Sequence, residues 1–165
     1  MKILVAGIGN IFQGDDAFGC EVVKILANRA LPRHVRLIDY GIRGLDLTYA
    51  LLDNPDLVIL IDATPQGCTP GTLYTIEPEL DEPDSTGMTQ NDALEAHGMN
   101  PARVLCTALA MGAKPGRVLL VGCEPGDLGG EEGWMGLTPP VAAALNGAAD
   151  MVEELICRTR TEVLV

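Results

Sequence analysis

The chain has 165 residues, of which 47% are hydrophobic, and its formal net charge is −12; this length suits a single domain over residues 1–165. The negative charge argues against nucleic acids and anionic membranes as partners, because their phosphates attract Lys and Arg. No apolar run approaches the roughly 20 residues that cross a bilayer, and the first residues lack the layout of a secretion signal, so we expect a cytoplasmic protein.

Short apolar runs alternate with helical patterns along the chain. In chain order we predict a strand at 3–7, a helix at 16–31, a strand at 35–38, a helix at 45–52 and strands at 57–61 and 71–76. A helix at 101–111, a strand at 117–122 and a helix at 139–158 follow. The runs at 3–7, 35–38 and 57–61 indicate buried parallel strands, whereas 71–76 suits an edge position.

This alternation predicts an α/β fold, a three-layer α/β/α sandwich around a mostly parallel, twisted five-stranded sheet. In such sheets the functional groups gather beyond the carboxyl ends of the strands, which directs attention to segments 7–16, 39–44 and 62–71. The connection 77–96 has seven acidic residues and no basic one. It is long for a compact domain, so we expect it to be either mobile or functional.

The first of these segments suggests a dinucleotide-binding turn, because glycines follow a strand and Asp39 ends the next strand. Phe12 occupies the position of the third glycine, however, and Asp15 and Asp16 would repel a pyrophosphate at the start of the helix. These residues disfavour the dinucleotide interpretation. Helix capping is an alternative role for Asp15 and Asp16, and it explains one carboxylate more easily than two.

Asp62 ends an apolar strand, where a carboxylate is costly unless it is paired, hydrogen-bonded or bound to a cation. A turn after the strand explains Asp62 equally well. His97 precedes a helix that begins at Asn100 and leads into a strand, so it falls on the same side of the sheet as Asp16 and Asp62. Two carboxylates and an imidazole form a ligand set that suits a divalent ion. The other histidine, His34, is expected to be a solvated surface residue.

The cysteines are widely spaced without a C-x-x-C pair, so their simplest interpretation is buried thiols in a reducing compartment. Cys106 falls on the apolar side of its predicted helix, which leaves His97 without a thiol partner for a cysteine protease. The usual signatures of serine hydrolases and zinc proteases are absent. The five cysteines of the chain are Cys20, Cys68, Cys106, Cys123 and Cys157.

Taken together, these motifs resemble the hydrogenase-maturation endopeptidases. The resemblance runs through nearly the whole chain and rests on residues 7–10 (GIGN), 14–19 (GDDAFG), 39–44 (DYGIRG), 58–63 (VILIDA), 97–99 (HGM), 116–118 (GRV) and 121–125 (VGCEP). It implies an aspartic-type endopeptidase that trims a C-terminal extension from the large-subunit precursor of a nickel–iron hydrogenase after nickel insertion. It also implies that Asp16, Asp62 and His97 are the catalytic and metal-contacting residues.

The same resemblance implies that the precursor supplies the nickel, and we expect no tightly bound organic cofactor. Asp39, Gly41 and Gly44 are candidates for the substrate groove, although turns and caps explain them as well. Family members carry Glu or Asp at the first metal position, where this chain has the shorter Asp16. The expected partner is the hydrogenase large-subunit precursor, and the chain itself is expected to be a monomer or a weak dimer. A dinucleotide-binding module and a non-catalytic metal-binding accessory protein remain alternatives.

Overall fold

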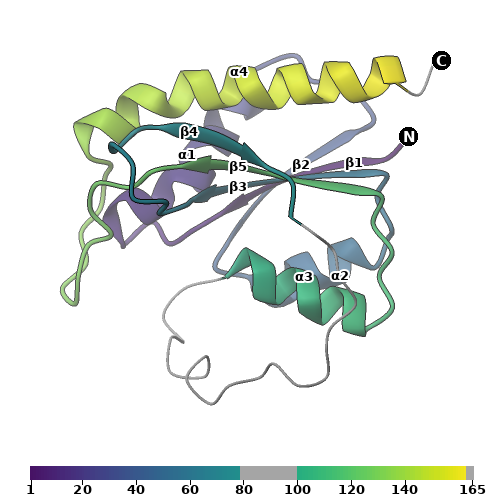
Figure 1. Ribbon diagram of the computed structural model, residues 1–165, viewed down its shortest axis with the longest axis horizontal. Coiled ribbons are helices and arrows are strands. Elements are labelled where there is room, and N and C mark those ends of the chain that lie inside the picture. Colours follow the sequence, from purple (N-terminus) through teal and green to yellow (C-terminus); the bar gives the residue numbers. More distant parts are fainter. Residues whose placement is uncertain (79–99, 163–165) are drawn as a thin grey trace.

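The computed structural model describes residues 1–78 and 100–162, with side chains up to residue 159 (Figure 1). Its five strands form one sheet in the order β2-β1-β3-β5-β4. Neighbouring strands run parallel except β4, which is antiparallel to β5. The strands are β1 (Ile3–Ile8), β2 (Val35–Gly41), β3 (Leu57–Ala63), β4 (Leu73–Ile76) and β5 (Arg117–Cys123).

Helices cover both faces of this sheet, as Figure 1 shows. On one face lie α1 (Phe18–Ala27) and α4 (Pro139–Glu162), which contact one another. On the other face α2 (Gly44–Leu51) packs beside α3 (Pro101–Ala110). The predicted three-layer α/β/α sandwich with a mostly parallel sheet is therefore confirmed. Within residues 1–78 and 100–162, no helix combines the length and apolar character needed to cross a membrane.

The core has two halves because successive side chains of a strand point to opposite faces. Ile3 and Val5 pack with α1 and α4, whereas Leu4 and Ala6 pack with α2 and α3. In β3 the residues 57, 59, 61 and 63 belong to the first half, and 58 and 60 to the second. The same alternation assigns Asp62 to the face that α2 and α3 cover.

Two local predictions were wrong. The strand at 35–38 is parallel as expected, but β2 forms an edge of the sheet and is mostly half-buried rather than buried. The expected buried thiols are buried only at Cys20 and Cys123. Cys106, predicted to be a core residue, is exposed on α3, as are the thiols of Cys68 and Cys157 elsewhere in the structure.

The start of α1 packs directly against the ends of β1 and β3. A Cβ atom added at Gly19 would overlap the carbonyl oxygens of Ile8 and Ile61, so only glycine permits this approach. It brings the short 3-10 helix η1 (Gly14–Ala17), which precedes α1, into contact with β3. Phe12, which stands at the position of the third glycine of a dinucleotide-binding turn, is 59% exposed.

Candidate active site

Asp16 and Asp62 lie together at the carboxyl ends of the central strands, where the sequence placed them. Asp62 is only 8% exposed at the end of β3, and Asp16 lies in η1, which contacts β3. Burial raises the pKa of Asp62 well above its ordinary value, and the negative charge of Asp16 raises it further, against a smaller opposing effect of the Ala63 amide. This electrostatic coupling identifies the two carboxylates as a pair.

The first loop, which joins β1 to α1 and includes η1, holds Asp16 in place. The amide of Asn10 donates a 2.8 Å hydrogen bond to Asp16 Oδ2. Burial raises the pKa of Asp16, and this hydrogen bond opposes the rise by stabilising the charged form. The sequence predicted capping as one role for Asp15 and Asp16, but both residues lie within η1, and their carboxylates accept hydrogen bonds from the amides of other segments.

Asp15 binds a second loop, which joins β5 to α4. Its fully buried carboxylate accepts hydrogen bonds from the amides of Gly126 (2.7 Å), Asp127 (2.9 Å) and Thr138 (2.7 Å). The Thr138 hydroxyl donates a fourth bond of 2.7 Å. Burial alone raises the pKa of Asp15, but these hydrogen bonds outweigh it and the pKa lies below the ordinary value. Asp15 thus fixes this loop beside the Asp16–Asp62 pair.

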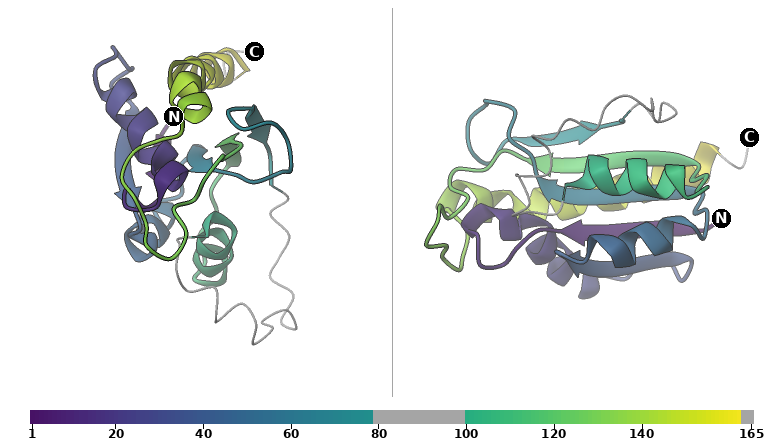
Figure 2. Two further views of the ribbon diagram at one scale, coloured as in Figure 1. Left: turned by 90° about the vertical axis from the view of Figure 1, so that its left-hand side faces the viewer. Right: turned by 90° about the horizontal axis from the view of Figure 1, so that it is seen from below.

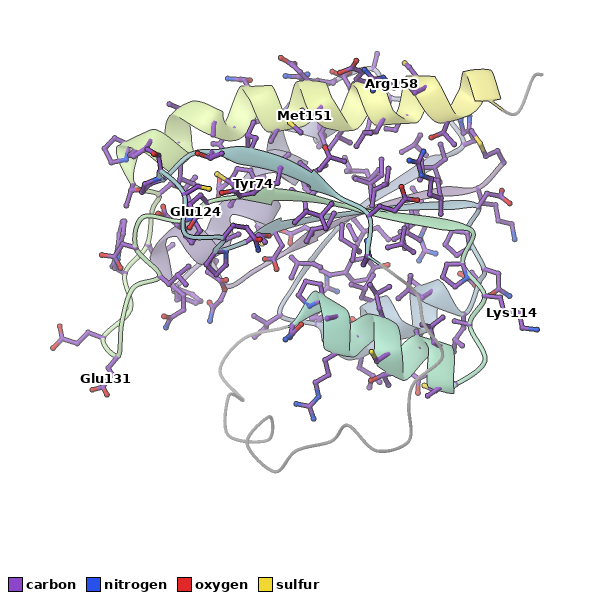
Figure 3. The ribbon with its side chains drawn as sticks, viewed as in Figure 1. Tyr74, Lys114, Glu124, Glu131, Met151 and Arg158 are labelled. Atoms are coloured by element: carbon purple, nitrogen blue, oxygen red, sulfur yellow. The ribbon has the colours of Figure 1, made fainter. Side chains whose placement is uncertain are left out.

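Glu124 performs a similar role at the end of β5. Its buried carboxylate accepts hydrogen bonds from the amides of Gln66 (2.7 Å) and Gly67 (3.1 Å) and from the hydroxyl of Tyr74 (2.7 Å), toward which it points in Figure 3. These bonds, first that of Tyr74, hold the pKa of Glu124 below its ordinary value. They connect the segment after Asp62 to β4 and β5.

Sequence reasoning missed the roles of Asp15 and Glu124. Glu124 carried a usable signal, because it follows a buried strand just as Asp62 does. The sequence signal at Asp15 was weaker, because the residues that donate hydrogen bonds to its carboxylate lie more than 110 residues away along the chain.

Asp39, Gly41 and Gly44 lie at the end of β2 and the start of α2. Asp39 Oδ1 accepts a 3.0 Å hydrogen bond from the Gly41 amide, and Gly41 has a φ of 55°, which favours glycine. The carbonyl of Gly41 in turn accepts a 3.0 Å bond from the Gly9 amide. Asp39 therefore supports the first loop, and with it Asp16, through this chain of contacts. Gly44 is the first residue of α2.

His97 and most of the acidic connection 77–96 lie outside the described residues. Asn100, the first residue described after them, caps α3 through hydrogen bonds from the amides of Ala102 and Arg103. The end of α3 lies near the start of β5, because only a short segment joins them. The start of α3 therefore lies at the carboxyl side of the sheet, the side that the left panel of Figure 2 faces. The part of the chain that the structure describes contains no group of three His, Cys, Asp or Glu side chains that could hold a metal ion. His34 is exposed, as predicted.

Comparison with known proteins adds the family. The HycI model, described as hydrogenase maturation protease, matches residues 20–155. The hydrogenase expression/formation protein HupD of Rhodobacter capsulatus is 38% identical over 156 residues, which cover 93% of this chain and 71% of that protein. The hydrogenase 2 maturation protease of Escherichia coli is 31% identical over 153 residues, covering 92% and 88%.

Solved structures agree in fold as well as in sequence. The hydrogenase maturating endopeptidase HybD from Escherichia coli superposes with a TM-score of 0.75 at 31% identity, covering 96% of this chain and 94% of that one. The maturation protease HycI from Thermococcus kodakarensis gives a TM-score of 0.70 at 25% identity, covering 93% and 90%. These likenesses favour a peptidase over a dinucleotide-binding module or an accessory protein. The chain belongs to the hydrogenase maturation protease family.

Proposed function

We propose that this protease removes a C-terminal extension from the nickel-loaded precursor of a nickel–iron hydrogenase large subunit. In this proposal the nickel arrives with the precursor as part of the substrate, and Asp16, Asp62 and His97 contact it. The enzyme needs no tightly bound organic cofactor and acts in the cytoplasm as a monomer or weak dimer. The observation that carries the proposal is the coupled Asp16–Asp62 pair at the carboxyl ends of the strands.

The pair suits a cation because a second negative charge beside buried Asp62 is unfavourable without one. Burial and the charge of Asp16 both favour the protonated form of Asp62. A divalent ion between the two carboxylates would reverse this preference, since a nearby positive charge favours the ionised form. The Asn10 amide already fixes Asp16 Oδ2 at 2.8 Å, so the carboxylate needs little reorganisation to bind.

His97 is the proposed third contact. It precedes Asn100 by three residues in the sequence, and chain geometry limits their Cα separation to roughly 11 Å. Asn100 begins α3 at the carboxyl side of the sheet, and Asp62 belongs to the face that α3 covers. An imidazole from this position would complete a mixed oxygen and nitrogen ligand set that a borderline divalent ion accepts.

In the proposed reaction the chain positions the scissile peptide and a water molecule. When the precursor is bound, its nickel supplies Lewis acidity for the scissile carbonyl. Asp16 or Asp62 accepts a hydrogen bond from the attacking water and orients it. Asp39, Gly41 and Gly44 border the substrate groove, and Asp39 also maintains the first loop through the Gly41 amide.

The direct experiment mixes the protein with a nickel-loaded precursor and follows the precursor's mass. Asp62→Asn and His97→Ala should abolish trimming, and circular dichroism should show that both variants remain folded. Asp53→Asn and His34→Ala are matched controls, because both side chains are exposed and lie away from the site. Persistent trimming by Asp62→Asn and His97→Ala would remove these residues from the catalytic site, and an unchanged wild-type mass would overturn the proposed function.

A further inference from the structure

Large apolar side chains are exposed on two adjacent loops next to Asp16. The first loop and the loop between β5 and α4 run side by side at this end of the molecule, which the left panel of Figure 2 faces. Clusters of exposed apolar side chains, unlike single ones, indicate interaction surfaces. We name this cluster the apolar rim, and its members, 37–66% exposed, are Ile11, Phe12, Leu128, Trp134 and Met135.

Hydrogen bonds hold the two loops of the apolar rim together. The Gly14 amide donates to the Trp134 carbonyl at 2.9 Å, and the Asp15 amide donates to the Asp127 carbonyl at 2.8 Å. The Asp15 carboxylate adds the bonds to Gly126, Asp127 and Thr138 described above. Because the backbone is already ordered, binding at this surface needs little further loss of chain entropy.

A groove of about 480 Å³ adjoins the apolar rim. Ile11 and Met135 contribute to both, and Ala17, next to Asp16, lines the groove wall. Its one cationic lining residue, Lys24, is paired with Glu21 at 2.5 Å, so the pair adds no net charge. Such a volume suits apolar side chains of a bound segment. The remaining lining residues are Gly136, Leu137 and Ala142.

The loops that carry the apolar rim are acidic. Segments 9–16 and 124–137 contain no Lys, Arg or His. Glu131 extends from the tip of the second loop, away from the body of the protein (Figure 3). Charge complementarity therefore favours a partner with basic side chains and disfavours an acidic one. Of the acidic residues, Asp127, Glu131 and Glu132 are exposed and Asp16 is half-buried, whereas Asp15 and Glu124 are buried.

We propose that the apolar rim and its groove dock a segment of the hydrogenase precursor in which apolar side chains adjoin basic ones. This inference rests on the proposed function, because it places the segment beside the Asp16–Asp62 pair where cleavage occurs. Apolar contacts provide binding, and the acidic loops select the charge of the segment. The surface acts on precursor affinity rather than on the chemical step.

Trp134 gives a direct readout, since it is the single tryptophan of the chain and belongs to the apolar rim. The probes are tryptophan-free synthetic peptides: one apolar and basic, one with the basic residues replaced by Glu, and one with the apolar residues replaced by Ser. The first peptide should change Trp134 emission at a concentration at least tenfold lower than the other two. Equal binding of all three, or no response to any, would overturn the proposal.

Variants locate the binding on the surface. Met135→Lys and Phe12→Ala should weaken the binding of the apolar, basic peptide roughly tenfold and fivefold, a loss that corresponds to about 1 kcal/mol or more. Met111→Lys is the matched control, because Met111 is 49% exposed at the far end of α3, and it should leave peptide affinity unchanged. Equal effects of the Met135 and Met111 substitutions would contradict the assignment.

Two further measurements separate this inference from the proposed function. With nickel-loaded precursor, Met135→Lys should raise KM about tenfold, and a wild-type KM would overturn the docking proposal while leaving the protease function intact. Failure of the wild-type protein to trim the precursor would overturn the proposed function, whereas the peptide titration judges the surface separately. A concentration-dependent dimer in sedimentation that Met135→Lys abolishes would assign the apolar rim to a second copy and overturn the proposal.

Discussion

Replacing Asp15 tests how the loop between β5 and α4 is held beside the Asp16–Asp62 pair. Asp15 Oδ2 accepts bonds from the Gly126 and Asp127 amides and from the Thr138 hydroxyl, and Oδ1 accepts the Thr138 amide. Asp15→Ala removes the acceptor of all these donors. Asp15→Asn keeps the shape, but one carboxylate oxygen becomes an NH2 group that faces a donor.

The expected loss follows from these contacts. A hydrogen bond to a charged group contributes about 1.5–3 kcal/mol, but bonds within one network are not additive, and the loop can shift so that water reaches the freed amides. Disrupting a buried charged network costs about 3–5 kcal/mol, which we expect for Asp15→Ala. In Asp15→Asn the amide oxygen can keep the donors at Oδ2, so we expect about 2–3 kcal/mol.

Urea unfolding followed by circular dichroism measures both losses. Asp127→Asn is the matched control, because Asp127 is exposed in the same loop and its Oδ1 accepts a local 2.7 Å bond from the Gly129 amide. We expect that control to cost less than about 1 kcal/mol. A similar small cost for Asp15→Asn and Asp127→Asn would refute the claim that buried Asp15 holds the loop.

Three further predictions follow from burial and charge. Iodoacetamide at pH 8 should alkylate the three exposed cysteines of the folded protein and spare Cys20 and Cys123, because burial raises the pKa of Cys20 to about 12 and that of Cys123 to about 11. Rapid modification of Cys20 or Cys123, detected by mass spectrometry, would contradict this prediction. Asp62→Asn should unfold at a higher temperature than the wild type at pH 7 while losing activity, because burial and the charge of Asp16 disfavour a negative charge on the Asp62 carboxyl; a lower melting temperature would count against it. Glu124→Gln should be destabilising at pH 7, and the difference should shrink on acidification below about pH 4, because the native state holds the pKa of Glu124 below its unfolded value. A difference that does not shrink on acidification would contradict the role of its charge. The three exposed thiols expected to react with iodoacetamide are Cys68, Cys106 and Cys157.

The sequence predicted the sheet well because its buried strands are short, continuous apolar runs with turn residues between them. The edge position of β2 was not predictable, since the run at 35–38 resembles a central strand and only the strand order decides its exposure. Cys106 was misplaced for a related reason: apolar neighbours along α3 did not reveal which side of the helix faces the sheet.

The site was predictable in part. The carboxyl-end rule located Asp62 and Asp16, and the structure brings them together. The different hydrogen-bond partners of Asp15 and Asp16 were not predictable, because they depend on η1 and on the loop between β5 and α4. Glu124 showed the same pattern as Asp62, an acidic residue after a buried strand, and that signal was overlooked. The position of His97 stays a prediction.

Comparing nickel-loaded with nickel-free precursor tests the central claim most directly. Both forms of the same hydrogenase large-subunit precursor are incubated with the wild-type protein, and the intact masses are measured over time. We predict that only the nickel-loaded form loses its C-terminal extension, and that Asp16→Asn or Asp62→Asn prevents this loss. Equal trimming of both forms, or trimming that survives these substitutions, would contradict the claim that the Asp16–Asp62 pair recognises the metal carried by the substrate.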